Sequence, residues 1–178
     1  GIHPDHRDDG IGFALKRAQW QMVRHQGLDH ITWTYDPLLS HNAYLNIAKL
    51  GAVCTTYRRS EYGEMRDGLN AGLPSDRFQL DWWINTRRVE RRLGKRPRPT
   101  LKLTHVARSG LRPFYSLLSS GGLPHPPEHI PPFEDRLLFA EIPVDFLELK
   151  SQDFGLARDW RFFTRELFET AFAKSYII

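Results

Sequence analysis

Apolar side chains recur every three or four positions near the start of the chain. This spacing over residues 10–26 predicts an amphipathic helix. The side expected to pack inward is made of Ile11, Ala14, Leu15, Ala18 and Met22. Basic residues in the last turn, followed by Gly27, are typical of a helix end. A helix is therefore the first regular element that the sequence predicts.

Three strands are predicted after this helix. Residues 30–35 (HITWTY) and 52–57 (AVCTTY) are rich in β-branched and aromatic residues, which favour strands. Residues 77–83 alternate between apolar and polar positions, which indicates a half-buried strand. The apolar positions of that strand are Phe78, Leu80 and Trp82.

A second helix is predicted between the first two strands. It starts at Ser40 or His41, reaches about Leu50 and is stopped by Gly51. The long segment 58–75 contains glycines and a proline and is expected to be a loop. The order helix, strand, helix, strand, strand indicates a mixed α/β or α+β fold.

The second half of the chain carries weaker patterns. Residues 86–93 predict a short basic helix, and the proline-rich segment 112–133 predicts an extended connector. Residues 137–142 (LLFAEI) are expected to form a further strand. Residues 153–174 predict an amphipathic helix with Asp153 as its N-cap.

The charge pattern and the single cysteine narrow the class of protein. The net charge is only +4, and eight basic residues with one acid gather in segment 87–102. This segment lacks interleaved aromatic residues and is interpreted as a solvated helix and turn, so nucleic acid is not expected as a partner. Cys54 alone forms no internal disulfide and suits the cytoplasm. No apolar run is long enough for a membrane span.

The turn over residues 2–12 (IHPDHRDDGIG) has the chemistry of an anion site. The first N–H groups of a helix have no partner within the helix, and the helix dipole makes that end positive. Gly10 and Gly12 allow a phosphate to approach the backbone, and Arg7 adds a charged donor. Asp8 and Asp9 leave a second interpretation open, in which this turn only caps the helix.

The same eleven residues are similar to the acyl-CoA signature of the GNAT superfamily of N-acyltransferases, V-x-P-x-[YF]-R-x-x-G-[IV]-G/A. The order of elements up to Trp83 also resembles this family. Segments 41–52 (HNAYLNIAKLGA) and 62–72 (YGEMRDGLNAG) and the tail from Glu141 look like a bacterial branch of predicted GNAT acetyltransferases.

This resemblance implies a division of the chain and a cofactor site. Residues 1–85 would form the second half of a GNAT-like domain, with a mixed sheet and flanking helices. Residues 86–136 would form a basic and proline-rich connector, and residues 137–178 a strand and amphipathic helix that make up a C-terminal extension. The N-terminal strands of the family have no counterpart here, which is expected of a fragment or a processed chain. The implied acyl-CoA ligands are Ile2, His3, Arg7, Asp8, Asp9, Gly10, Ile11, Gly12 and Asn42. For Asn42 helix capping is the alternative.

The catalytic residues follow less directly from the resemblance. Many GNAT enzymes carry a tyrosine that protonates the leaving thiolate four residues before the position of Gly51, and Ile47 occupies that place here. The candidates on the same helix are Tyr44 and Asn46. Asp36, at the end of a strand, is the candidate for orienting the acceptor, with turn formation before Pro37 as the alternative.

The expected function is direct transfer of an acetyl or other short acyl group from acyl-CoA to an amine acceptor, with no metal. One alternative is a GNAT-like module that binds acyl-CoA or a partner protein without catalysis, and another is an inactive fragment. An unpaired sheet edge near Ile2 predicts self-association, including a possible homodimer.

Overall fold

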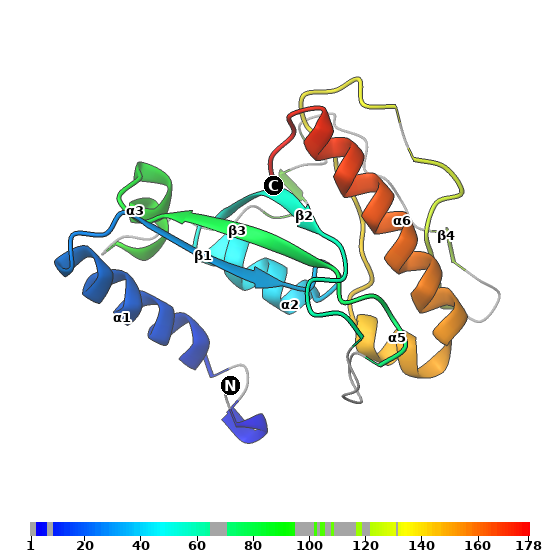
Figure 1. Ribbon diagram of the computed structural model, residues 1–178, viewed down its shortest axis with the longest axis horizontal. Coiled ribbons are helices and arrows are strands. Elements are labelled where there is room, and N and C mark those ends of the chain that lie inside the picture. Colours follow the sequence, from blue (N-terminus) through cyan, green and yellow to red (C-terminus); the bar gives the residue numbers. More distant parts are fainter. Residues whose placement is uncertain are drawn as a thin grey trace.

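The computed structural model describes residues 3–6, 9–64, 71–94, 102, 104–105, 108, 117–118, 122–130 and 132–178. Its centre is an antiparallel three-stranded sheet of β1 (His30–Tyr35), β2 (Val53–Arg58) and β3 (Arg77–Trp83), in the order β1-β3-β2. The three predicted strands are therefore confirmed. Helices surround this sheet, so the mixed α and β composition predicted from the sequence is also confirmed (Figure 1).

The register of β1 and β3 gives the sheet one apolar and one polar face. Ile31 lies opposite Trp82, Trp33 opposite Leu80 and Tyr35 opposite Phe78. The residues between them are mainly polar and pair in the same way, as Thr32 does with Asp81 and Thr34 with Gln79. Because neighbouring residues of a strand point to opposite faces, the apolar set is directed toward the helices and forms the main core.

Helix α1 (Ile11–His25) forms where the sequence predicts it and is followed by Gly27 with φ of 74°. Its inward side, however, carries Trp20 and Val23. The indole N–H of Trp20 donates to the carbonyl of Ile84 at 2.9 Å, which ties α1 to the end of β3.

The predicted inward face of α1 is wrong. Leu15 is 61% exposed and Met22 is 56% exposed, and Ile11, Ala14 and Ala18 are exposed as well. Trp20 offers more apolar area than any residue of that stripe, and its N–H needs a partner when buried. Both requirements are met only when Trp20 faces the sheet.

The second predicted helix begins as α2 (Ser40–Ala43) and continues as the π-helical segment η2 (Tyr44–Lys49). The π form shows in the bond from the N–H of Leu50 to the carbonyl of Leu45, at 2.9 Å. Gly51, with φ of 75°, ends the helix as predicted.

Helix α3 (Arg87–Leu93) follows the sheet and confirms the predicted basic helix. Two of its arginines are not simply solvated. Arg88 donates from Nε to the carbonyl of Gly51 at 2.9 Å, and Arg92 donates to the carbonyl of Ala48. These guanidinium groups satisfy carbonyls at the end of η2, where cations are favoured.

Helices α5 (Phe146–Gln152) and α6 (Phe154–Ala173) form the C-terminal part. The predicted helix 153–174 is confirmed, and the Asp153 side chain accepts from the N–H of Leu156 at 2.8 Å as its N-cap. Figure 1 shows α6 beside β2, at the end of the sheet away from α1. Phe168 of α6 packs against Phe78 with ring centroids 4.7 Å apart, so α6 contributes to the same core as the sheet.

The chain's last described residues extend the sheet at its β2 edge. The N–H of Cys54 donates to the carbonyl of Ile178 at 2.9 Å, and the N–H of Ile178 donates back at 3.0 Å. The remaining short elements are η1 (Pro4–His6), β4 (Leu117–Leu118) and β5 (Pro124–His125), of which β4 and β5 pair with each other.

The predicted strand 137–142 is wrong, because these residues have no regular secondary structure. Leu137 is exposed, and none of the six residues joins either described sheet. A strand requires a neighbouring strand for its backbone hydrogen bonds. The apolar composition of residues 137–142 is therefore not sufficient for them to form a strand.

Candidate functional site

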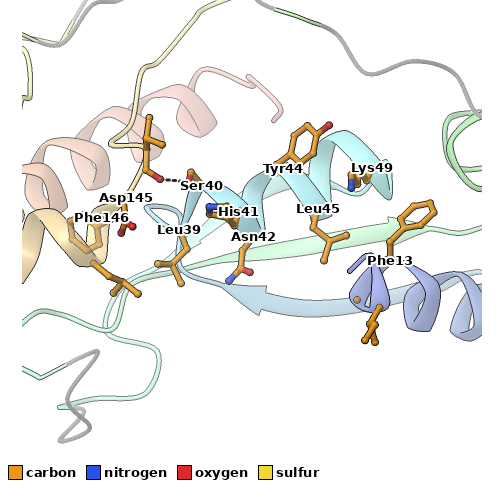
Figure 2. Close-up of a pocket in the computed structure, with 15 residues that line it drawn as sticks. Phe13, Leu39, Ser40, His41, Asn42, Tyr44, Leu45, Lys49, Asp145 and Phe146 are labelled. Atoms are coloured by element: carbon orange, nitrogen blue, oxygen red, sulfur yellow. Dashed lines mark hydrogen bonds between the residues drawn. The ribbon is translucent and has the colours of Figure 1, made fainter. Parts of the chain in front are cut away.

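A cleft of about 770 Å³ opens where three chain segments meet. Its walls are the start of α1 (Gly10–Phe13), the helix from Leu39 to Lys49, and the start of α5 (Val144–Leu147). Figure 2 shows Phe13 and Lys49 at one end of this cleft and Asp145 and Phe146 at the other, with Ser40, His41, Asn42 and Tyr44 between them.

The start of α1 borders the cleft, and its first backbone N–H groups have no partner within the helix. Gly10 is the N-cap, with a left-handed φ of 77°, and as a glycine it has no side chain that could cap the helix. The first turn carries no acidic residue. In contrast, α5 also borders the cleft but is capped by Asp145, whose Oδ1 accepts from the N–H of Glu148 at 3.0 Å. The start of α1 is therefore the positive end of the helix dipole on this cleft.

The structure brings together four of the residues predicted to bind the cofactor. Gly10, Ile11 and Gly12 line the cleft from one side, and Asn42 lines it from another. Asn42 and His41 lie after the N-cap position, which Leu39 occupies. Both are exposed and face the cleft instead of capping the helix.

The other predicted cofactor residues do not contribute to the described cleft wall. His3 and Asp9 are exposed, and each belongs to a local pair: Nδ1 of His3 lies 3.6 Å from Asp5, and Nδ1 of His6 lies 3.4 Å from Asp9. Ile2, Arg7 and Asp8 lie outside the described residues.

Of the three predicted catalytic residues, Tyr44 lines the cleft. Its ring is half-exposed, and the ammonium group of Lys49 lies 5.4 Å from the ring centroid. Asn46 is buried within η2 and is not part of the cleft wall. Ile47 is partly buried and packs against the main core.

Asp36 was expected at the cleft as an acceptor-orienting acid, but it lies in a buried ion network. Its carboxylate accepts from Arg161 at 2.9 and 2.5 Å and from Arg77 at 3.4 Å, while Oδ1 also accepts from the N–H of Leu38 at 2.9 Å. Burial lowers the pKa of Arg161, but the Asp36 carboxylate outweighs this effect and holds that pKa above its usual value. Asp36 is thus a structural charge partner and not part of the cleft wall.

A second buried carboxylate lies close to the first. Asp76 accepts from Arg165 at 2.8 and 2.9 Å, from the hydroxyl of Tyr57 at 2.8 Å and from the N–H of Ser60 at 3.0 Å. Burial alone would raise the pKa of Asp76, but these donors hold it below its usual value. Together the two carboxylates fasten α6 to the sheet.

Sequence reasoning missed several residues of the cleft. Lys49 and the whole wall Val144–Leu147 were not among the predicted site residues. Val144 reaches the cleft through a long-range contact, in which Ser40 Oγ donates to its carbonyl at 2.5 Å across 104 positions of sequence. No local pattern in the sequence signals a contact of that kind.

A scan against protein-family models, a search of curated proteins and a search of solved structures each returned no match. Within the described ranges, no three His, Cys, Asp or Glu side chains are grouped so that they could hold a metal ion. In the same part of the chain, no helix has both the length and the apolar character needed to cross a membrane.

Proposed function

We propose that the cleft binds acyl-CoA and that the protein transfers the acyl group to an amine acceptor. One observation carries this proposal. Gly10, Ile11 and Gly12 on one wall and Asn42 on another were selected from the sequence as cofactor ligands, and they line the same cleft. Two distant segments that resemble the acyl-CoA site of GNAT enzymes thus face one space large enough for a ligand of drug-like size.

The proposed binding mode uses the start of α1, where the N-cap is Gly10. Backbone N–H groups at Gly12 and Phe13 would donate to the pyrophosphate, and the helix dipole would favour its negative charge. Lys49 lines the same end of the cleft and adds a positive charge. Asn42 offers an amide for hydrogen bonds to the pantetheine portion of the cofactor.

Transfer requires attack of the amine nitrogen on the thioester carbonyl. A C–N bond forms, the C–S bond breaks and CoA leaves as a thiolate, while the amine loses one proton and the thiolate gains one. His41 and Tyr44 are the cleft residues with suitable chemistry. An imidazole nitrogen of His41 can accept the proton, and the phenol of Tyr44 can donate one.

Binding without catalysis is the second candidate function, and Ile47 favours it. The resemblance implies a proton-donating tyrosine at that position in many GNAT enzymes, whereas the side chain of Ile47 packs against the core. Both candidate functions therefore include binding of acyl-CoA, and they differ in whether the acyl group is transferred.

Calorimetric titration with CoA and acetyl-CoA tests the binding step. Gly12→Trp places a large side chain in the cleft wall, and its effect should be compared with Ala14→Trp, which changes an exposed residue of the same helix outside that wall. We expect wild type and Ala14→Trp to bind with similar affinity and Gly12→Trp to lose at least tenfold. Absence of binding by the wild type, or equal binding by Gly12→Trp, would refute the site.

Thiol release from acyl-CoA in the presence of an amine panel separates the two candidate functions. Acceptor-dependent release that falls in Tyr44→Phe without loss of CoA affinity supports transfer with Tyr44 as the proton donor. CoA binding without release for any amine supports the binding module.

A further inference from the structure

The cleft differs in chemistry between its two ends (Figure 2). One end holds the start of α1 and Lys49, which offer N–H groups and a positive charge. The other end is lined by Leu39, Val144, Phe146 and Leu147, which are apolar, and by Asp145, whose carboxylate is engaged as the N-cap of α5. A ligand that fills the whole cleft therefore has an anionic part and an apolar part.

The apolar end leaves hydrophobic surface uncovered. Val144 is 81% exposed and Leu147 is 37% exposed, although both belong to a well-anchored segment. Phe146, between them in space and sequence, is buried in a second core cluster with Leu38 and Leu149. Exposed apolar side chains that gather on one wall of a cleft indicate a binding surface.

One hydrogen bond joins this wall to α2, and a second one orders the start of α5 within the wall itself. Ser40 Oγ donates to the carbonyl of Val144 at 2.5 Å, and Asp145 caps α5 through the N–H of Glu148 at 3.0 Å. Ser40 begins α2, which carries His41 and Asn42 toward the cleft and continues into η2 with Tyr44. The apolar wall and the proposed reaction centre are therefore held by the same short helix.

We infer that the acyl donor carries a chain longer than acetyl, which lies against Leu39, Val144 and Leu147. This inference rests on the proposed function, and it differs from the short acyl group implied by the sequence resemblance. A pair of methylene groups that is withdrawn fully from water tightens binding by roughly tenfold, and a pair that this wall covers on one side contributes less. The start of α1 would hold the same cofactor at its phosphates, so the chain extends toward the far end of the cleft.

The test compares calorimetric affinities for CoA, acetyl-CoA and octanoyl-CoA. For the wild type we expect octanoyl-CoA to bind at least thirtyfold more tightly than acetyl-CoA. Val144→Asn and Leu147→Asn should remove most of this ratio while leaving the affinity for CoA itself unchanged. Leu137→Asn changes an exposed leucine outside the cleft wall and should retain the full ratio.

The outcomes separate this inference from the function on which it rests. Equal affinity for acetyl-CoA and octanoyl-CoA, with CoA still bound, overturns the chain-length inference and leaves the cofactor site standing. If the ratio of the affinities for octanoyl-CoA and acetyl-CoA is unchanged in both Val144→Asn and Leu147→Asn, the inference is also overturned, because the acyl chain then lies elsewhere. A preference for octylamine over ethylamine in the acetyl-CoA complex, lost in Leu147→Asn, would assign the wall to the acceptor and contradict the inference. No binding of CoA at all refutes the proposed function.

Discussion

Arg161 of α6 donates two hydrogen bonds to the carboxylate of Asp36, at the end of β1, across 125 positions of sequence. The Arg161 side chain is 2% exposed and that of Asp36 is 7% exposed. A buried charge without its partner is costly, so each residue holds the other in place. This pair makes the C-terminal helix part of the fold that supports the cleft.

We expect Arg161→Met to lower the free energy of unfolding by about 3–5 kcal/mol, because among the described residues the substitution leaves the buried Asp36 carboxylate with Arg77 alone as an ion-pair partner. Urea unfolding followed by circular dichroism measures the change. Arg158→Met, at an exposed position of α6, is the matched control and should change the free energy by less than about 0.5 kcal/mol.

A double variant distinguishes the ion pair from simple packing by Arg161. Asp36→Asn combined with Arg161→Met removes both charges and should recover a large part of the lost stability. Strictly additive losses in the double variant would show that the two residues do not act as a pair.

Asp76 predicts a loss of stability in acid. Its pKa in the folded protein lies below the usual value of about 3.9 because of Arg165, Tyr57 and the N–H of Ser60. Unfolding therefore takes up a proton, so this contribution is complete above the usual pKa and is lost as the pH falls through the lowered folded value. We expect the urea concentration at which half of the protein is unfolded to decrease as the pH is lowered from about 5 to about 2.

Asp76→Asn checks this assignment. The variant should be less stable than the wild type by about 2–3 kcal/mol at pH 7, and its midpoint should depend less on pH in the acid range. Asp159→Asn, at an exposed position of α6, should retain the wild-type dependence. An unchanged acid profile in Asp76→Asn would assign the effect to other carboxylates.

Cys54 should react slowly with thiol reagents while the protein is folded. Burial raises the pKa of its thiol to about 12, and the charge of Asp81 acts in the same direction. At pH 8 the reactive thiolate is then rarer by roughly three orders of magnitude than in an unfolded chain. We expect reaction with Ellman's reagent to be at least a hundredfold slower in buffer than in 8 M urea. Equal rates would show that β2 opens readily.

Local patterns in the sequence predicted most helices and strands because their signals lie within the elements themselves. The alternation of Phe78, Leu80 and Trp82 fixes which face of β3 is buried, and Gly27 and Gly51 end helices where a left-handed φ is needed. The inward side of α1 could not be predicted in this way. The apolar residues Leu15 and Met22 have helical spacing, but the side of α1 that packs against the sheet is the one that carries Trp20.

In the candidate site too, residues with a local signal in the sequence could be predicted, and residues placed by long-range contacts could not. The glycines at the start of α1 and Asn42 carry local signals, and they line the cleft. The role of Asp36 depends on Arg161, and the apolar wall depends on the contact between Ser40 and Val144. Both contacts join distant segments, and the sequence contains no periodicity that would indicate them. In segment 137–142 the local signal for a strand is present, but the strand does not form because the segment has no neighbouring strand.

The exposed stripe of α1 and the edge of β1 predict self-association of the isolated chain. Leu15 and Met22 lie uncovered on α1, and within the described sheet β1 has a neighbour only on its β3 side. The strand carries no Lys, Asp, Glu or Pro that would discourage edge pairing. Uncovered apolar surface next to such an edge favours association between copies.

We therefore expect the molar mass measured by size-exclusion chromatography with light scattering to rise with protein concentration. The double variant Leu15→Glu, Met22→Glu should shift this rise to at least tenfold higher concentration, with the free energy of unfolding within about 1 kcal/mol of the wild type because both side chains are already in water. Gln21→Glu combined with Arg17→Gln changes the net charge by the same two units at other exposed positions of α1 and controls for net charge. A wild-type chain that stays monomeric at all concentrations, or a double variant that associates equally, would show that this surface does not drive association.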